Sequence, residues 1–355
     1  MGIKLIKLTG LSVAFLGMTS ALPSYAGYEI KLSETDSITF GGYIKVDARN
    51  VNGTIPYRDY WIGSGTVSQH DVSQFRINAR ETRINTKYVH GDVSGFIEFD
   101  LYGGNSDVGN EVISNSYAPR LRHAFIKYDD WLAGQTWSTF MNTSAIPETA
   151  DFGGTLVGEA FIRQGQIRYS AYGFQFALEN PETVSTSKDK NDKYPDVVLK
   201  YTLKDDWGNV SLAALGRHLD DASGVEESTL GLSLAGRIKT FGKDDFRFQY
   251  HWGKLGRYVG VTLAKDIVNG KVEKSTAYTL AYRHYWDDTL RSSLFYARGE
   301  TKYTDAERSQ YGVNLFKNLT KKLSVGIEYG RYEVLDVGKT HGDSDYVQFS
   351  AKYVL

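Results

Sequence analysis

Sixteen short segments of alternating apolar and polar residues follow one another along most of the chain, and none of the stretches between them has the period of a helix. Alternation with a period of two is typical of a β-strand with one apolar and one polar face. The sequence therefore predicts an all-β protein with about 16 strands. The predicted strands are 38–48, 75–89, 93–101, 121–128, 131–136, 164–171, 174–179, 197–203, 210–217, 230–239, 246–252, 277–285, 290–298, 309–316, 323–332 and 346–355.

The connections between these segments are short and long in turn. The short ones are rich in Gly, Asp and Asn, which form tight hairpin turns. An even-stranded outer-membrane barrel has short turns at its periplasmic end and long loops at its outer end. Seven short turns and eight long loops thus predict a transmembrane antiparallel β-barrel. The short turns are 91–92, 129–130, 172–173, 205–208, 242–245, 287–288 and 318–321.

The two faces of the later strands support a barrel in lipid. Leu230, Leu232 and Leu234 share one face of a strand, and Ser233 and Arg237 share the other. A soluble sandwich, such as a secreted lectin, also alternates. Aromatic residues beside the short turns favour the membrane, because Trp and Tyr gather at membrane interfaces. These aromatic residues are Tyr128, Trp131, Tyr172, Trp207, Tyr285 and Trp286.

Residues 1–26 have the features of a secretory signal peptide. Lys4 and Lys7 precede an apolar run at 8–18, and Ser-Tyr-Ala at 24–26 is a small-x-small cleavage site. The apolar run is too short for a membrane-spanning helix. The alternative to a signal peptide is an N-terminal helix buried in the folded protein. We therefore expect an exported protein whose barrel domain occupies residues 27–355.

One long connection, at about 137–163, interrupts the pattern after the fifth strand. It holds aromatic and aliphatic residues throughout, so we expect it to be ordered. A loop of this length is usually functional when it is not disordered. We predict that it folds into the barrel as a constriction loop and carries Glu148, Asp151 and Glu159 toward the pore.

Strand parity places more basic than acidic side chains on the inward face. Basic residues around a pore favour anions. We predict anion preference, with Arg80, Arg122 and Arg168 contributing most and exposed Arg58 little. The predicted pore-lining residues are Arg80, Arg122, Arg163, Arg168, Arg237, Arg247, Arg283 and Arg291.

Two early segments, 75–89 and 121–128, carry charges on both parities, as Arg80 and Glu81 do in the first of them. A charged outer face is costly in lipid. These strands are therefore expected to contact a neighbouring subunit of a symmetric assembly.

Several functions are disfavoured by what the sequence holds. Cysteine is absent, and the seven histidines form no spaced pair or catalytic arrangement. We predict no enzyme, no catalytic residue, no cofactor and no metal site. A formal net charge of −1 argues against nucleic-acid binding. The charge run 189–196 is most simply a solvated loop, with a Ca²⁺ site as the alternative. A non-conducting adhesin or structural barrel is the alternative to a channel.

The motifs around the long loop resemble the central signature of the DcaP-like porins of Gram-negative outer membranes. They are GQTWSTFM at 134–141, PET at 147–149, DFG at 151–153 and RQGQIRY at 163–169, and GYIKVD at 42–47 is similar to the first strand of that family. The resemblance covers the barrel domain. It implies a homotrimer in outer-membrane lipid and passive diffusion of small anionic solutes such as dicarboxylates.

Overall fold

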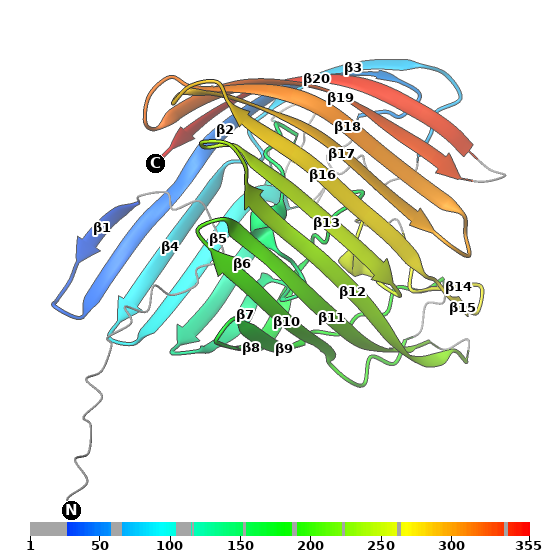
Figure 1. The fold of residues 1–355 in the computed structure, drawn as a ribbon, viewed down its shortest axis with the longest axis horizontal. Helices are drawn as coiled ribbons and strands as arrows, with labels where there is room; N and C mark the ends of the chain where they lie inside the picture. The colour runs from blue at the N-terminus through cyan, green and yellow to red at the C-terminus, as the bar shows by residue number, and fades with distance from the viewer. Residues whose placement is uncertain are drawn as a thin grey trace, which may run out of the picture.

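The computed structural model describes residues 27–57, 66–103, 115, 117–151, 154–186, 190–221, 224–260, 264–336 and 340–355. The predicted signal peptide and Arg58 lie outside these residues. The strands form a closed antiparallel barrel (Figure 1). Their bounds are β1 Tyr28–Lys31, β2 Asp36–Gly53, β3 Val72–Asn78, β4 Arg83–His90, β5 Val93–Gly103, β6 Ala118–Tyr128, β7 Trp131–Trp137, β8 Arg163–Ala171, β9 Phe174–Glu179, β10 Asp196–Asp205, β11 Gly208–Asp220, β12 Glu226–Lys239, β13 Asp245–Gly253, β14 Ile267–Val268, β15 Lys271–Val272, β16 Ser275–Tyr285, β17 Leu290–Thr301, β18 Ala306–Asn318, β19 Leu323–Asp336 and β20 Thr340–Val354.

The barrel closes between its first long strand and its last. β2 pairs with β20 from Tyr43 opposite Val354 to Gly53 opposite Ser344. On its other side β2 pairs with both β3 and β4, which together occupy one position in the wall. The wall therefore has sixteen positions. Closure leaves no open edge there, as a bilayer requires.

The sixteen-stranded barrel is confirmed, as is the separation of short turns from long connections; fifteen of the predicted strands are continuous and one, 75–89, is divided into β3 and β4. The short turns lie at the left in Figure 1, and the long connections lie at the right with the small β14–β15 hairpin, which the alternation did not predict. The strands extend further into the long loops than expected. Among the described residues, no helix is long and apolar enough to cross a membrane.

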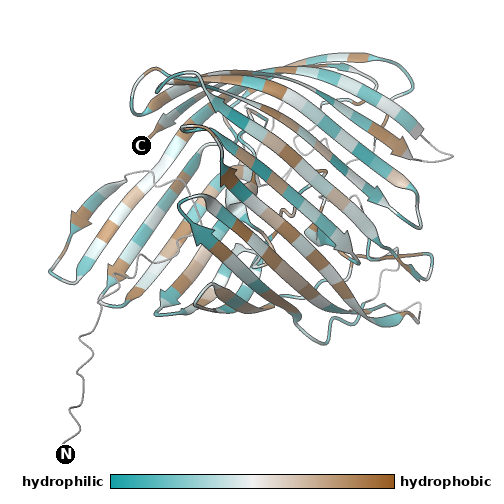
Figure 2. Ribbon diagram, viewed as in Figure 1, coloured by the Kyte–Doolittle hydropathy of each residue, from teal (hydrophilic) through white to brown (hydrophobic). Residues whose placement is uncertain are grey.

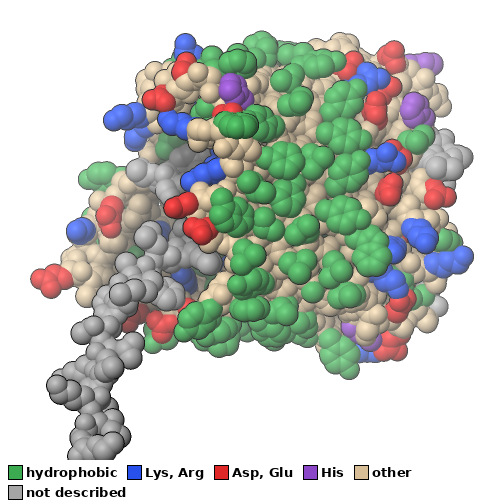
Figure 3. Space-filling model, viewed as in Figure 1, with side chains coloured by type: hydrophobic (Ala, Val, Ile, Leu, Met, Phe, Trp, Pro, Cys, Tyr) green, Lys and Arg blue, Asp and Glu red, His purple; other side chains and the backbone are tan. Residues whose placement is uncertain are grey.

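The wall is apolar outside and polar inside. Leu212, Leu230 and Leu294 are 60%, 55% and 64% exposed on the outer face, whereas Ser233 and Gln249 are buried. Alternating hydropathy runs along each strand in Figure 2, and Figure 3 shows apolar side chains over the middle of the outer face. Tyr128, Trp131, Tyr172, Trp207 and Trp286 are exposed beside the short turns, as expected for an aromatic girdle.

The predicted strand 75–89 is broken. A turn from Ala79 to Thr82, closed by Thr82 N–H donating to the Ala79 carbonyl at 3.1 Å, separates β3 from β4. Arg80 and Glu81 are both buried. The turn lets two consecutive charged side chains avoid the lipid-facing surface, which strict alternation would not allow.

A β-bulge has the same effect in β6. Glu98 of β5 faces His123, and Phe99 faces Leu121, so Arg122 is the extra residue. Arg122 and His123 are 1% and 0% exposed. The mixed-parity charges that suggested a subunit contact therefore point inward at these positions.

Candidate functional site

Residues 138–162 connect β7 to β8 and are called the inner loop. Ser138 N–H donates to the Ile162 carbonyl at 3.0 Å, so the two ends of the loop meet at the wall. A short 3-10 helix, η3 (Thr143–Ala145), begins after Asn142, whose side chain accepts from the Ser144 N–H. The Asn142 amide also donates to Ser211 Oγ at 2.9 Å and to the Ala235 carbonyl at 3.2 Å. These bonds hold the first half of the loop against β11 and β12.

The middle of the inner loop is held by Glu328 of β19. The N–H groups of Ala150 and Asp151 donate to this carboxylate at 2.6 and 3.2 Å. Asn314 and Tyr346 donate to it as well, each at 2.9 Å, and Glu328 is 0% exposed. Two of these four hydrogen bonds fix the loop backbone to β19, and the other two hold Asn314 and Tyr346 of the wall in place.

Two wall cations complete the attachment. Arg49 of β2 pairs with Asp151, and Lys45 donates to the Ala150 carbonyl at 3.0 Å. Gln348 of β20 donates to the same carbonyl at 2.5 Å. The loop is therefore bound to the far side of the barrel from its own ends.

Glu148 lies between two arginines of the opposite wall. Arg291 of β17 donates to both of its carboxylate oxygens, at 2.6 and 2.8 Å, and Arg283 of β16 lies at 3.3 Å. Burial opposes ionisation of Glu148, but the hydrogen bonds from Arg291 and the arginine charges outweigh it and lower the pKa of the carboxyl group. Glu148 is therefore a fixed negative charge among cations.

Glu159 has the opposite environment. Its partners are Thr155 Oγ1 at 3.1 Å and Gln249 Nε2 at 3.2 Å, with no salt bridge among the described residues. Burial raises its pKa to about 7, although both hydrogen bonds favour the ionised form. Its carboxyl group faces β13 and does not line the cavity described below.

Stability should depend on pH through Glu159. Between pH 4.5 and about 7 the folded chain keeps a proton that the unfolded chain has lost, so the free energy of unfolding falls as pH rises. Glu159→Gln should remove this dependence and stabilise the barrel at pH 8 by about 3 kcal/mol. The temperature at which the band shifts in heat-modifiability gels, measured from pH 5 to 8, tests this.

Glu148→Gln is the matched control for that experiment. The pKa of Glu148 is lowered, so its contribution is present at neutral pH and is lost as pH falls. This variant should lose stability at neutral pH. A pH profile for Glu159→Gln that is identical to that of the unmodified protein would contradict the prediction.

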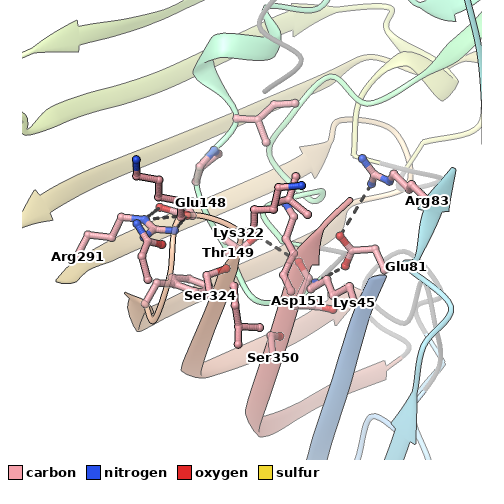
Figure 4. Close-up of a pocket in the computed structure, with 18 of the residues that line it drawn as sticks. Lys45, Glu81, Arg83, Glu148, Thr149, Asp151, Arg291, Lys322, Ser324 and Ser350 are labelled. Carbon is pink, nitrogen blue, oxygen red and sulfur yellow. Dashed lines mark hydrogen bonds and ion pairs between the residues drawn. The ribbon is translucent and has the colours of Figure 1, made fainter. Parts of the chain in front are cut away.

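A cavity of about 460 Å³ lies beneath the inner loop at the short-turn end of the barrel. In Figure 4 Arg291 and Glu148 lie at one end of this cavity, and Glu81 and Arg83 lie at the other. Its lining holds seven Lys or Arg residues and three Asp or Glu residues. The basic residues are Lys45, Arg83, Arg122, Arg291, Lys321, Lys322 and Lys352; the acidic ones are Glu81, Glu148 and Asp151.

Each acid of the lining has a basic partner. Glu81 pairs with Lys45, Glu148 with Arg291, and Asp151 with Arg49. Arg122 pairs with two acids behind the lining, Glu98 at 2.8 Å and Asp100 at 3.0 Å. The uncompensated charge of the lining is therefore positive, and it lies toward Arg83 and the lysines.

Aromatic rings are interleaved with these cations. The guanidinium of Arg163 lies 4.4 Å from the Trp137 ring centroid, and that of Arg122 lies 5.7 Å from it. Arg83 and Lys352 lie 5.2 and 4.3 Å from the ring of Tyr43. Such contacts hold long cationic side chains in place without neutralising them.

The predicted site residues fall into several groups. The cavity brings together Arg122, Arg291, Glu148 and Asp151. Arg237, Arg247 and Arg283 converge on Asp245 of β13. Arg163 stacks on Trp137, whereas Arg80 lies 4.6 Å from the ring of Tyr117. Arg168 is half-buried in β8 and does not line the cavity.

Several cavity residues were missing from the predicted set. Parity would have selected Lys352, which shares the inward face of β20 with Gln348 and Ser350. Arg83 follows the turn that separates β3 from β4. The alternation begins again after this turn, so counting from β3 does not predict which face of the wall Arg83 lies on. Lys321 and Lys322 lie in a short turn, where parity carries no information.

Acidic residues at the long-loop end already have partners. His218, Asp220 and Glu226 have ligand atoms within 4.8 Å of one another, but Lys193 lies 2.8 Å from Asp220. In the charge run 189–196, Asp192 accepts from the Thr183 N–H at 2.9 Å. Asp196 pairs with Arg217 at 3.3 Å, and Asp189 lies outside the described residues.

Comparison with known proteins places this geometry among outer-membrane barrels. The family model described as DcaP outer membrane protein matches residues 32–351. The crystal structure of the outer membrane channel DcaP of Acinetobacter baumannii has a TM-score of 0.80 and 20% identity, and the match covers 93% of this chain and 100% of that one. No curated protein sequence matches the chain.

Two further solved structures share the barrel fold. The anion-selective porin from Comamonas acidovorans has a TM-score of 0.59 and 14% identity, with 90% of this chain and 100% of that one covered. Salmonella typhi OmpF has a TM-score of 0.59 and 15% identity, with 92% and 100% covered. At these identities the likeness concerns the fold.

Proposed function

The chain belongs to the family of DcaP outer membrane proteins, and on that basis we propose that it is a porin that lets small hydrophilic solutes diffuse passively and prefers anions, dicarboxylates among them. Its location is the outer membrane of a Gram-negative bacterium. Membership of this family agrees with the prediction that the chain is not an enzyme.

The observation that carries the proposed anion preference is the charge of the cavity. Its lining has four more basic than acidic residues. Adding the paired residues behind the lining, Arg49 and Arg120 against Glu98 and Asp100, leaves this excess unchanged. Where water is scarce these charges are weakly screened, so anions should concentrate there.

The inner loop supplies the proposed constriction. Its contacts with β11, β12, β19 and β20 support a path across the lumen, and solutes would then pass between the loop and the wall. Glu148 illustrates how this lumen holds a carboxylate, because Arg291 binds both of its oxygens. A dicarboxylate would find further basic side chains at the other end of the cavity.

Reversal potentials in planar bilayers test this function. Under a KCl gradient, the unmodified protein should show discrete conductance steps. Its reversal potential should be displaced from zero toward the equilibrium potential of chloride. The displacement should be larger near 0.1 M than near 1 M salt, because the screening length falls from about 10 Å to about 3 Å. Cation selectivity would contradict the anion preference, and a silent membrane would favour the non-conducting adhesin or structural barrel.

A homotrimer is the proposed assembly, as the family resemblance implies. An apolar groove on the outer face of β4 to β7, lined in part by Gly95, Ala124 and Ala133, would admit the surface of a second copy. Native mass spectrometry in mild detergent tests this proposal. A monomer would contradict it, as would a trimer in which Leu230, Leu232 and Leu234 form the subunit contact.

A further inference from the structure

Two aromatic rings face the cavity beside the arginines. Trp137, the last residue of β7, and Phe161, near the end of the inner loop, meet edge to face with their centroids 4.8 Å apart. Both side chains are half-buried and line the cavity. The guanidinium groups of Arg163 and Arg122 lie within 6 Å of the indole. This part of the wall therefore offers aromatic and cationic groups side by side.

Arg83 offers a charge to the same space. Its Nη2 atom lies 3.9 Å from Glu81 Oε1, beyond hydrogen-bond distance, while Glu81 is bound by Lys45. Figure 4 shows the Arg83 side chain extending from β4 into the region of the cavity. An incoming carboxylate could satisfy this guanidinium without breaking a short ion pair.

We infer that the cavity contains a subsite for carboxylates that carry a flat aromatic ring. The carboxylate pairs with Arg83, and the ring lies against Trp137 and Phe161. A ring gains from edge-to-face contact with these side chains and from the nearby guanidinium groups. A carboxylate with a saturated ring of similar size is stabilised only by the ion pair with Arg83 and by the apolar area that it buries. This inference rests on the proposed function, because the solute must enter the pore.

Block of the KCl current by two matched anions tests the subsite. Benzoate and cyclohexanecarboxylate, both ionised at pH 7.5, are titrated against the channel in a planar bilayer. The concentration for half-block should be about fivefold lower for benzoate. Trp137→Leu should remove this ratio, and Trp137→Tyr should retain most of it. Trp131→Leu, the same change on the outer face of the same strand, should leave it unchanged.

Arg83→Gln separates the charge from the ring. This variant should raise the half-blocking concentration of both anions and leave their ratio near its original value. An unmodified channel that is anion-selective but blocked equally by both anions would overturn the subsite and leave the proposed function standing. Cation selectivity would overturn the proposed function itself. Loss of the ratio in Trp131→Leu, or its survival in Trp137→Leu with normal KCl conductance, would also overturn the subsite.

Discussion

Glu328→Ala is expected to loosen the middle of the inner loop at the barrel wall, where Arg49, Lys45 and Gln348 are its remaining anchors. The buried carboxylate accepts four hydrogen bonds, two from the loop backbone at Ala150 and Asp151 and two from Asn314 and Tyr346. Without it the backbone N–H groups of Ala150 and Asp151 lose the acceptor that holds them to β19, whereas Asn314 still donates to the Glu148 carbonyl at 2.8 Å. Docking of the loop should weaken by about 4 kcal/mol, or about a thousandfold in the ratio of docked to undocked states.

A cysteine reporter measures this release. The chain has no cysteine, so Ala150→Cys provides a single labelling site at a position that is 0% exposed. A charged, thiol-specific reagent should react slowly with this variant alone. After addition of Glu328→Ala the reaction should be faster by two to three orders of magnitude, about the change in the docking equilibrium. The open-channel conductance should rise as well, because the middle of the loop is undocked for a larger share of the time.

Glu333→Ala is the matched control. Glu333 lies on the same strand, but its carboxylate binds Ser309 and Arg331 and makes no contact with the inner loop. Its replacement should leave both the labelling rate and the conductance unchanged. If Glu328→Ala labels no faster than the Ala150→Cys parent, the carboxylate does not hold the loop.

The double variant Lys322→Glu/Lys352→Glu is expected to abolish anion selectivity. Lys322 is exposed in the turn after β18, and Lys352 is half-buried in β20, and both line the cavity. Each replacement changes the local charge by two, so together they cancel the excess of four basic residues. Under the same KCl gradient, the reversal potential should move away from the equilibrium potential of chloride, to zero or to the sign that indicates cation selectivity.

Lys271→Glu/Lys302→Glu changes the net charge of the chain by the same amount elsewhere. Both lysines are exposed at the long-loop end and do not line the cavity. This control should keep nearly all of the anion preference, since the charges of exposed side chains are screened within about 10 Å at 0.1 M salt. Equal effects of the two double variants would show that overall charge, rather than the cavity, sets selectivity.

Much of the barrel could be predicted because alternation is a local property of the chain. The face of Leu230, Leu232 and Leu234 follows from a period of two, and the two ends of the barrel follow from the lengths of the connections. The same reasoning located the inner loop between Trp137 and Arg163, where β7 ends and β8 begins. These features need no knowledge of which strands are neighbours.

Parity failed where the backbone departs from regular pairing. The turn at 79–82 and the bulge at Arg122 each insert residues that break the period of two. In both places a second charged or polar side chain joins the first inside the barrel. The alternation of apolar and polar residues does not predict these irregularities. With regular pairing one of the charged side chains would lie in lipid, and the free-energy cost of that depends on its neighbours in the folded barrel.

The sequence by itself determined the barrel, its two ends, its polar interior and the presence of acids on the inner loop. Only the tertiary structure decided what those acids meet. Glu148 lies against Arg291, Asp151 against Arg49, and Glu159 turns to Gln249. The partners of Glu148 and Asp151 are 143 and 102 residues away in sequence. Such pairings depend on the path of the loop across a closed wall, which exists only after β2 and β20 have joined.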